Sequence, residues 1–204
     1  MRSSINTRRL RWLTCIGLLA VSNVFLLTSI GAGAVGAALS PPEDGFKATT
    51  VFLVRHAEKA ATPPEDPPLL ESGSKRAQEL SHLLAKAGIK SIYTSQFLRT
   101  KQTAEPLARD LGIESSVIRI RMSASNPREI SQDTLKEMAE KIYERAGENV
   151  LIVGHSNTIP EVIRVLGGDV IPTIDEKDYD DLFVVTVYAR GKARVAHLKY
   201  GNTR

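Results

Sequence analysis

Two short apolar runs, each ending next to a histidine, constrain the fold of this chain more than any other feature. Residues 51–54 are followed at once by Arg55-His56, and residues 150–153 are followed by Gly154-His155. Unbroken apolar runs of this length are typical of parallel strands that are buried on both faces. In open α/β sheets ligands bind beyond the carboxyl ends of the strands, so these polar residues indicate a functional site. For a lone Arg-His pair, the alternative is a solvated strand end.

The rest of the chain alternates between helical and strand patterns. Apolar residues at helical spacing and capping residues predict four helices, over residues 74–87, 96–111, 131–146 and from Thr158 onward. Further strands are predicted at residues 89–95 and 117–122, and a hairpin at 183–189 and 194–200. Strands that alternate with helices predict an α/β fold with parallel strands.

The amino-terminal segment has the composition of an export signal. Arg2, Arg8, Arg9 and Arg11 precede a strongly apolar run over residues 13–30, and small residues follow. This run approaches the ~20 residues that cross a bilayer, so an uncleaved membrane anchor is the alternative to a cleaved signal. We expect an exported protein, periplasmic or extracytoplasmic, with residues 13–30 as the membrane tether if the signal is retained. The predicted organisation is a signal or anchor at 1–39, a linker at 40–47 and a folded domain at 48–204.

Charge and cysteine content exclude several functions. The four amino-terminal arginines account for the whole formal charge of +4, so the predicted domain is balanced and gives no sign of a nucleic-acid partner. Cys15 is the only cysteine and lies in the apolar segment. The domain therefore has no disulfide, no cysteine nucleophile and no thiolate metal site. His56-Ala57-Glu58 matches the H-x-E of zinc deaminases, but the cysteine half of that site is absent.

Three predicted strand ends supply side chains suited to phosphoryl chemistry. Arg55 and His56 follow the first strand, Ser95 the second, and His155 the strand at 150–153; Arg99 lies in the first turn of a helix. Guanidinium groups pair bidentately with the oxygens of a phosphoryl group in transfer. A neutral imidazole can attack phosphorus and give a phosphohistidine that water later hydrolyses. We therefore expect a phosphate site with His56 as nucleophile.

The motifs at these strand ends resemble those of the histidine phosphatase superfamily, which has the phosphoglycerate mutase-like fold. The resemblance covers roughly residues 49 to 200 and rests on three segments: Arg55-His56-Ala57-Glu58-Lys59; Tyr93-Thr94-Ser95 with Arg99-Thr100 and Gln102-Thr103-Ala104; and Gly154-His155-Ser156. It implies a three-layer α/β/α sandwich with a mostly parallel sheet. It also implies a phosphomonoesterase with His56 as the phosphorylated nucleophile, a phosphate pocket of Arg55, Arg99 and His155, a small phosphorylated substrate, and no metal or cofactor.

The general acid is the one role that the sequence leaves open. Members of the family with a clear acid place a glutamate after the third strand, where this chain has Glu129; Asp66, in the proline-rich loop at 60–73, is an equal candidate. Glu58 and Lys59 have no chemical step and are expected at the rim of the pocket. Two alternatives to a phosphatase remain: a phosphate-binding module without turnover, and a phosphoglycerate mutase-like phosphotransferase. The sequence does not indicate the oligomeric state.

Overall fold

Six strands form one mixed sheet in the computed structural model, which describes residues 47–201. The strands are β1 (Thr49–Arg55), β2 (Ile89–Thr94), β3 (Ser116–Val117), β4 (Asn149–Gly154), β5 (Asp181–Ala189) and β6 (Lys192–Lys199). Their spatial order is β3-β2-β4-β1-β5-β6. The four strands from β3 to β1 are parallel, whereas β5 runs antiparallel to both β1 and β6. The prediction of a mostly parallel sheet is confirmed.

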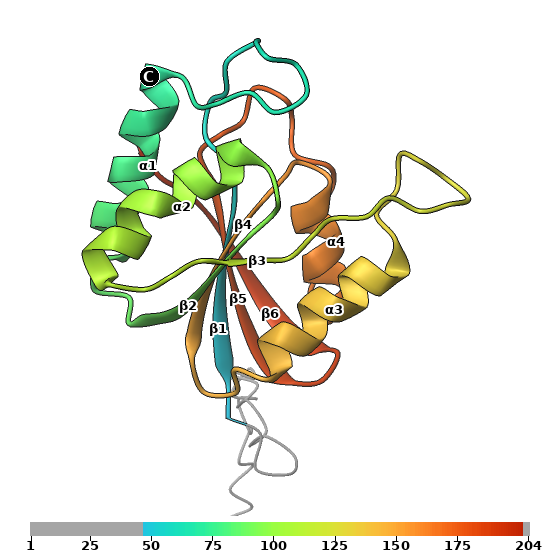
Figure 1. The fold of residues 1–204 in the computed structure, drawn as a ribbon. Coiled ribbons are helices and arrows are strands. Elements are labelled where there is room, and N and C mark those ends of the chain that lie inside the picture. The colour runs from blue at the N-terminus through green and yellow to red at the C-terminus, as the bar shows by residue number, and fades with distance from the viewer. Residues whose placement is uncertain (1–46, 202–204) are drawn as a thin grey trace, which may run out of the picture. The chain divides into compact units, whose positions relative to one another are not determined.

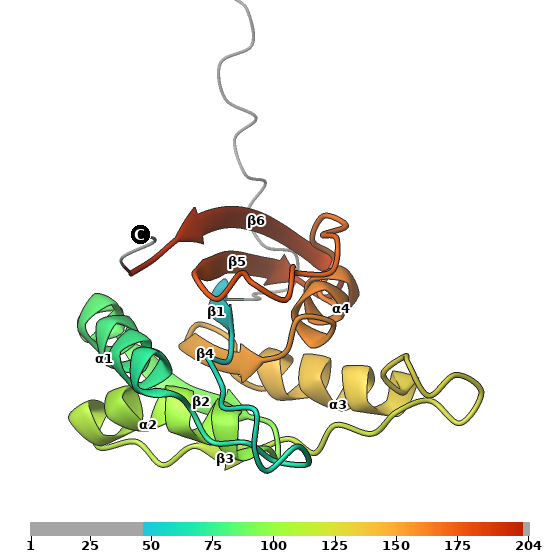
Figure 2. The same ribbon diagram turned by 90° about the horizontal axis from the view of Figure 1, so that it is seen from above.

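Two pairs of helices cover the two faces of this sheet. The helices are α1 (Glu71–Leu84), α2 (Leu98–Leu111), α3 (Gln132–Tyr143) and α4 (Thr158–Val165). In both ribbon views α1 and α2 lie on one side of the sheet and α3 and α4 on the other (Figures 1 and 2). Each pair packs on its own apolar cluster, so the fold is the expected three-layer α/β/α sandwich.

The alternation of side chains along the central strands explains why the two apolar runs have no polar break. Leu53 and Ile152 belong to the apolar cluster under α3 and α4, whereas Val54 and Val153 belong to the cluster under α1 and α2. All four side chains are at most 1% exposed. Because both faces of β1 and β4 are covered, the runs 51–54 and 150–153 are apolar throughout.

The predicted third strand is mostly wrong. The pattern indicated residues 117–122, but β3 is only Ser116–Val117, and Met122 pairs in an isolated bridge with Ile130. The Gln96 side-chain amide explains the early end of the strand, because it forms both backbone hydrogen bonds of Ile120. Oε1 accepts from the Ile120 N–H (2.9 Å), and Nε2 donates to the Ile120 carbonyl (3.1 Å). The segment between β3 and α3 therefore leaves the sheet and projects from the domain (Figures 1 and 2).

Several helix ends follow the predicted caps and one does not. Ser131 caps α3 by accepting from the Thr134 N–H, and Gly112 ends α2 with φ of 64°. The helix predicted from Thr158 onward does begin at Thr158, but its N-cap residue, Asn157, makes no side-chain cap hydrogen bond. Glu161 pairs with Arg164 at 2.8 Å.

The predicted signal or anchor and most of the predicted linker, residues 1–46, lie outside the described residues. Within residues 47–201, no helix is long and apolar enough to cross a membrane.

Candidate active site

The carboxyl ends of β1 and β4 bring the two histidines of the sequence motifs together. The His56 N–H donates to the Gly154 carbonyl at 3.0 Å, which continues the parallel pairing one residue beyond β1. The rings of His56 and His155 lie edge to face with centroids 5.3 Å apart. Both side chains, with Arg55 and Arg99, line a cavity of about 460 Å³. The structure thus assembles all four predicted site residues in one place.

The hydrogen bonding of His56 determines which ring nitrogen is free. Its Nδ1 lies 2.8 Å from the Ala57 carbonyl, which can only accept, so Nδ1 carries the proton. Nε2, the other ring nitrogen, makes no hydrogen bond within the described residues and is left with its lone pair. Burial lowers the pKa of His56 against the opposing hydrogen bond to Ala57, and together with the charges of Arg55, Arg99 and Lys59 it brings the pKa from 6.5 to about 4. The imidazole is therefore neutral at pH 7 and available as a nucleophile.

His155 is held by two hydroxyl groups from the start of α2. Its Nε2 lies 2.9 Å from Ser95 Oγ, and Ser95 Oγ lies 2.9 Å from Thr100 Oγ1. The ring also meets Phe97 edge to face at 5.4 Å. Burial, followed by the charges of its neighbours, lowers the pKa of His155 to about 3. Both histidines are thus neutral hydrogen-bonding groups beside two permanent cations.

Arg55 is fixed by the loop that follows α4. Its NH1 donates to the carbonyls of Asp175 (2.7 Å) and Asp178 (3.2 Å), and the Tyr179 ring lies 4.3 Å from its guanidinium carbon. NH2 lies 3.5 Å from Glu176 Oε2. Arg55 is only 2% exposed, and its buried Nε has no partner within the described residues. An unpaired buried donor is costly, which sets Arg55 apart from an arginine that only holds the fold together.

Arg99, in the first turn of α2, also has a buried Nε without a partner among the described residues. Its guanidinium lies over Phe97 at 4.4 Å. Burial lowers the pKa of Arg99, an effect that Asp66 opposes and Arg55 strengthens. A buried guanidinium group, Arg55, and a partly buried one, Arg99, line one cavity, and such a pair suits an anion.

Two further motif residues position the site without lining the cavity. Thr103 Oγ1 accepts from the Ala57 N–H at 2.9 Å and so holds the backbone directly after His56. Gln102 Oε1 accepts from the Leu69 N–H at 2.8 Å and fixes the proline-rich loop on α2. The helix α2 thus organises both the nucleophile and the loop beside it.

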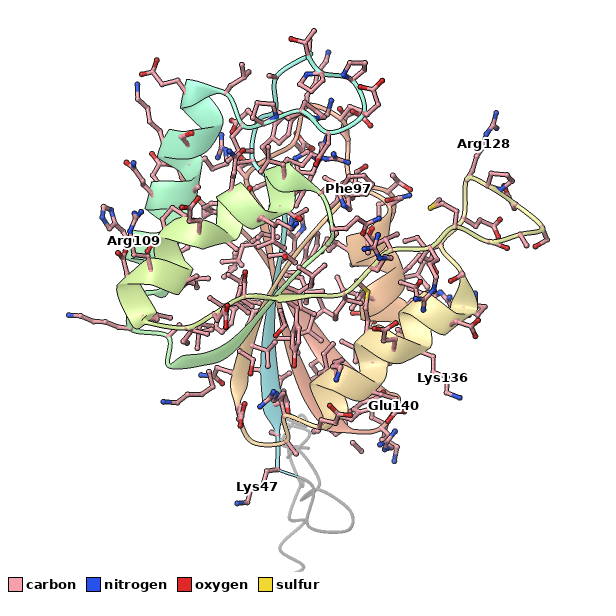
Figure 3. All side chains as sticks on the ribbon, viewed as in Figure 1. Lys47, Phe97, Arg109, Arg128, Lys136 and Glu140 are labelled. Carbon is pink, nitrogen blue, oxygen red and sulfur yellow. The ribbon has the colours of Figure 1, made fainter. Side chains whose placement is uncertain are left out.

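Neither acid expected from the sequence lines this cavity. Asp66 caps α2 through the Leu98 N–H (2.8 Å) and lies 3.8 Å from Arg99. Glu129 accepts from Asn126 in the segment between β3 and α3 and lines a separate cavity. Figure 3 shows the neighbouring Arg128 far out on this segment, whereas Phe97 lies at the start of α2.

One residue of the site was missed by the sequence analysis. Glu176 lines the cavity beside Arg55, and it comes from an acidic loop that the sequence alone marks only as a connector. No motif brings this loop to the end of β1, because the contact spans 121 positions along the chain. Glu176 is the only carboxylate from residues 47–201 that lines this cavity.

Glu58 and Lys59 were both expected at the rim of the pocket, and the structure places only one of them there. Lys59 lines the cavity as expected, but Glu58 does not. Glu58 accepts two hydrogen bonds from Arg76 Nε at 3.0 Å and one from Arg76 NH2 at 2.8 Å. Burial by itself raises the pKa of the Glu58 carboxyl, but the hydrogen bonds from Arg76, the backbone hydrogen bond of Glu58 and the charge of Arg76 together leave the pKa below its usual value.

The cavity also has an apolar side and no metal-binding cluster. Phe97, Ile120 and Met122 line it together with the cationic groups, so an apolar group attached to a bound anion would meet these three side chains. Among the described residues, no group of three or more histidine, cysteine, aspartate and glutamate side chains could hold a metal ion.

Comparison with known proteins finds one family model that matches part of this chain. Residues 51–123 match the family model of the histidine phosphatase superfamily (branch 1). No curated protein sequence matches the chain. The matched segment contains Arg55-His56 and Arg99, and the third motif at His155 lies beyond it.

Solved structures with the same fold are phosphatases and mutases. The protein histidine phosphatase SixA complexed with tungstate is 18% identical, with a TM-score of 0.55, 74% of this chain covered and 96% of that one. A mycobacterial glucosyl-3-phosphoglycerate phosphatase gives 15% identity, a TM-score of 0.59 and coverage of 76% and 100%. Phosphoglycerate mutase from Bacillus anthracis is 17% identical, with a TM-score of 0.57, 75% of this chain covered and 93% of that one. The family-model match confirms the resemblance to the histidine phosphatase superfamily over residues 51–123, and the solved structures confirm the phosphoglycerate mutase-like fold.

Proposed function

We propose that this protein is a metal-independent phosphomonoesterase that works through a phosphohistidine on His56. The observation that carries the proposal is the neutral imidazole of His56, with its free Nε2, in the same cavity as the guanidinium groups of Arg55 and Arg99. A phosphoryl group bound by the two guanidinium groups would bring phosphorus to the free nitrogen of His56.

The reaction follows from the position of each group. The Arg55 and Arg99 donors bind the phosphoryl oxygens and neutralise the charge that spreads over them in the transition state. His56 Nε2 attacks phosphorus while Nδ1–H keeps its bond to the Ala57 carbonyl, which stabilises the positive charge on the ring. His155, held by Ser95, contacts the same group from the carboxyl end of the neighbouring strand β4. Water then attacks the phosphohistidine and releases phosphate and neutral His56.

The two alternatives make different demands on the site. A binding module without turnover would not need a free imidazole nitrogen next to the phosphate, yet His56 presents one. A mutase-type phosphotransferase would return the phosphoryl group to another hydroxyl of the substrate instead of to water. Both use the same anion pocket, so the products of the reaction distinguish them. The substrate class we propose is a small phosphomonoester.

The test is to incubate the domain with p-nitrophenyl phosphate, measure phosphate release, and trap the intermediate at low temperature for mass spectrometry. We expect phosphate release and a mass increase of one phosphoryl group on His56. Since nucleophile and transition-state contacts are lost together, His56→Ala should lower kcat/KM by at least about 10³-fold. His82→Ala is the matched control, because His82 is exposed on α1. The absence of hydrolysis by the unmodified domain between pH 4 and 8 would refute the proposal.

A further inference from the structure

The phosphatase reaction needs a proton for the leaving oxygen, and neither of the acids indicated by the sequence lies in the cavity. We propose that Glu176 donates this proton. This inference rests on the proposed function, because it assigns a step within the same site. It replaces Asp66 and Glu129 in that role.

The position of Glu176 is the first argument. It is the only carboxylate of the described residues that lines the cavity with both histidines, and its Oε2 lies 3.5 Å from Arg55 NH2. Asp66 is occupied as the cap of α2 and as the partner of Arg99. A proton donor must be within hydrogen-bond reach of the leaving oxygen, and a group beside the phosphate-binding guanidinium meets that requirement.

The anchoring of its loop is the second argument. Arg55 NH1 binds the carbonyls of Asp175 and Asp178, which flank Glu176 in the chain, and Tyr179 stacks on the same guanidinium. The loop is also tied to the β4–α4 turn by the Ile174 N–H, which donates to the Ser156 carbonyl at 3.2 Å. The residue that binds the phosphate therefore also sets the place of the carboxylate, so substrate and Glu176 share one reference point.

The change of partners on substrate binding is the third argument. Without substrate, Glu176 faces the charge of Arg55, with Lys59 and Arg99 on the same cavity, and its side chain is 85% exposed. A phosphate dianion that binds Arg55 takes away the ion-pair partner of Glu176 and places a second negative charge beside it. Once released from Arg55, the exposed side chain of Glu176 is free to reach the leaving oxygen.

The step balances in both halves of the reaction. The lone pair of His56 Nε2 forms the N–P bond, the P–O bond to the leaving group breaks, and the Glu176 carboxyl proton passes to the leaving oxygen to give the alcohol. In the second half, the Glu176 carboxylate takes a proton from the attacking water, the N–P bond breaks, and phosphate leaves. His56 returns to its neutral form and Glu176 to its protonated form.

The experiment compares Glu176→Gln with the unmodified protein on 2,4-dinitrophenyl, p-nitrophenyl, phenyl and benzyl phosphate. The value to measure is kcat/KM, because it reports the step in which the leaving group departs. For the dinitrophenyl ester, whose leaving group needs no proton, we expect a change of less than about 3-fold. For the benzyl ester we expect a loss of about 10²-fold or more, in the range of general acid catalysis.

Two control variants separate this role from indirect effects. Glu129→Gln removes the carboxylate outside the cavity and should leave all four values unchanged. Asp66→Asn keeps a cap for α2 but weakens the hold on Arg99, so it should lower all four values by a similar factor.

The outcomes are distinct. An equal loss of kcat/KM on all four esters for Glu176→Gln would show that Glu176 only positions Arg55. A fall in KM on all four esters would show that Glu176 only competes with the phosphate for Arg55. Either result overturns the proposal. A loss confined to Asp66→Asn or Glu129→Gln on the benzyl ester would also overturn it. Formation of the His56 adduct from the dinitrophenyl ester is tested separately, so the proposed function stands or falls by itself.

Discussion

Arg55 and Arg76 are two largely buried arginines whose partners differ in kind. Arg76 gives its Nε and NH2 donors to both oxygens of Glu58, in a bidentate pair at 2.8–3.0 Å. Arg55 receives two backbone carbonyls, a stacked tyrosine and an exposed carboxylate, while its buried Nε stays without an acceptor. A complete set of partners indicates a structural role, and an incomplete set indicates a place for a ligand.

The comparison also separates residues that are neighbours in one motif. Arg55 and Glu58 are three positions apart, yet Arg55 lines the cavity and Glu58 pairs with α1. Gly73 shows how closely α1 approaches this segment, because a Cβ there would lie 2.2 Å from the Glu58 carbonyl oxygen. Glu58 therefore docks a helix instead of lining the cavity.

The largest effect that can break this comparison is on activity. Arg55→Met should lower kcat/KM for p-nitrophenyl phosphate by about 10³-fold, because the transition state loses a charged bidentate partner. Arg76→Met should change kcat/KM by less than about 3-fold in the folded fraction, since Arg76 does not line the cavity. Steady-state kinetics below the melting temperature of both variants measures this. A large loss in Arg76→Met would mean that the two arginines do not differ in role.

The next effect is on stability, and here we expect it from Arg76 instead of Arg55. Arg76→Met leaves the Glu58 carboxylate, only 20% exposed, without its partner, so the free energy of unfolding should fall by about 3 kcal/mol. The double substitution Arg76→Met with Glu58→Leu removes both charges and should recover most of this loss. Urea denaturation followed by circular dichroism measures both. If the single substitution costs less than about 1 kcal/mol, the pair is not structural.

The smallest effect is a pH dependence of stability that arises from His56, next to Arg55 in the chain. Burial lowers the pKa of His56 from 6.5 to about 4, so between these values the unfolded chain binds more protons than the folded one. Stability from this group is full above pH 6.5 and is lost as the pH falls toward 4, by about 2 kcal/mol between pH 7 and 5.

The control for this pH dependence is the variant His56→Gln, compared with the unmodified domain by thermal unfolding over the same pH range. Its loss of stability between pH 7 and 5 should be smaller by about 2 kcal/mol, since only the unmodified domain must exclude a proton from His56. Equal slopes would contradict the neutral, buried state of His56 on which the nucleophilic role depends.

The sequence predicted the frame of the site because the relevant signals are local. An apolar run that ends in Arg55-His56, and another that ends at His155, are typical of strands covered on both faces, and parallel strands of this kind end at one edge of the sheet. The cap of α3 at Ser131 and the end of α2 at Gly112 also follow from neighbouring residues. The failures involve partners distant in sequence: Gln96 shortens β3 by bonding Ile120, and the place of Asp66 is set by the amino terminus of α2.

The chain's sequence by itself determined the fold class, the family resemblance and the four residues Arg55, His56, Arg99 and His155. Tertiary structure decided the rest: which ring nitrogen of His56 is free, which arginine donors lack an acceptor, and that Glu176, not Asp66 or Glu129, is the carboxylate in the cavity. The physical reason is that periodicity and motifs record how a residue relates to its neighbours in the chain. A partner 121 positions away is selected only when packing brings two loops to the same strand end.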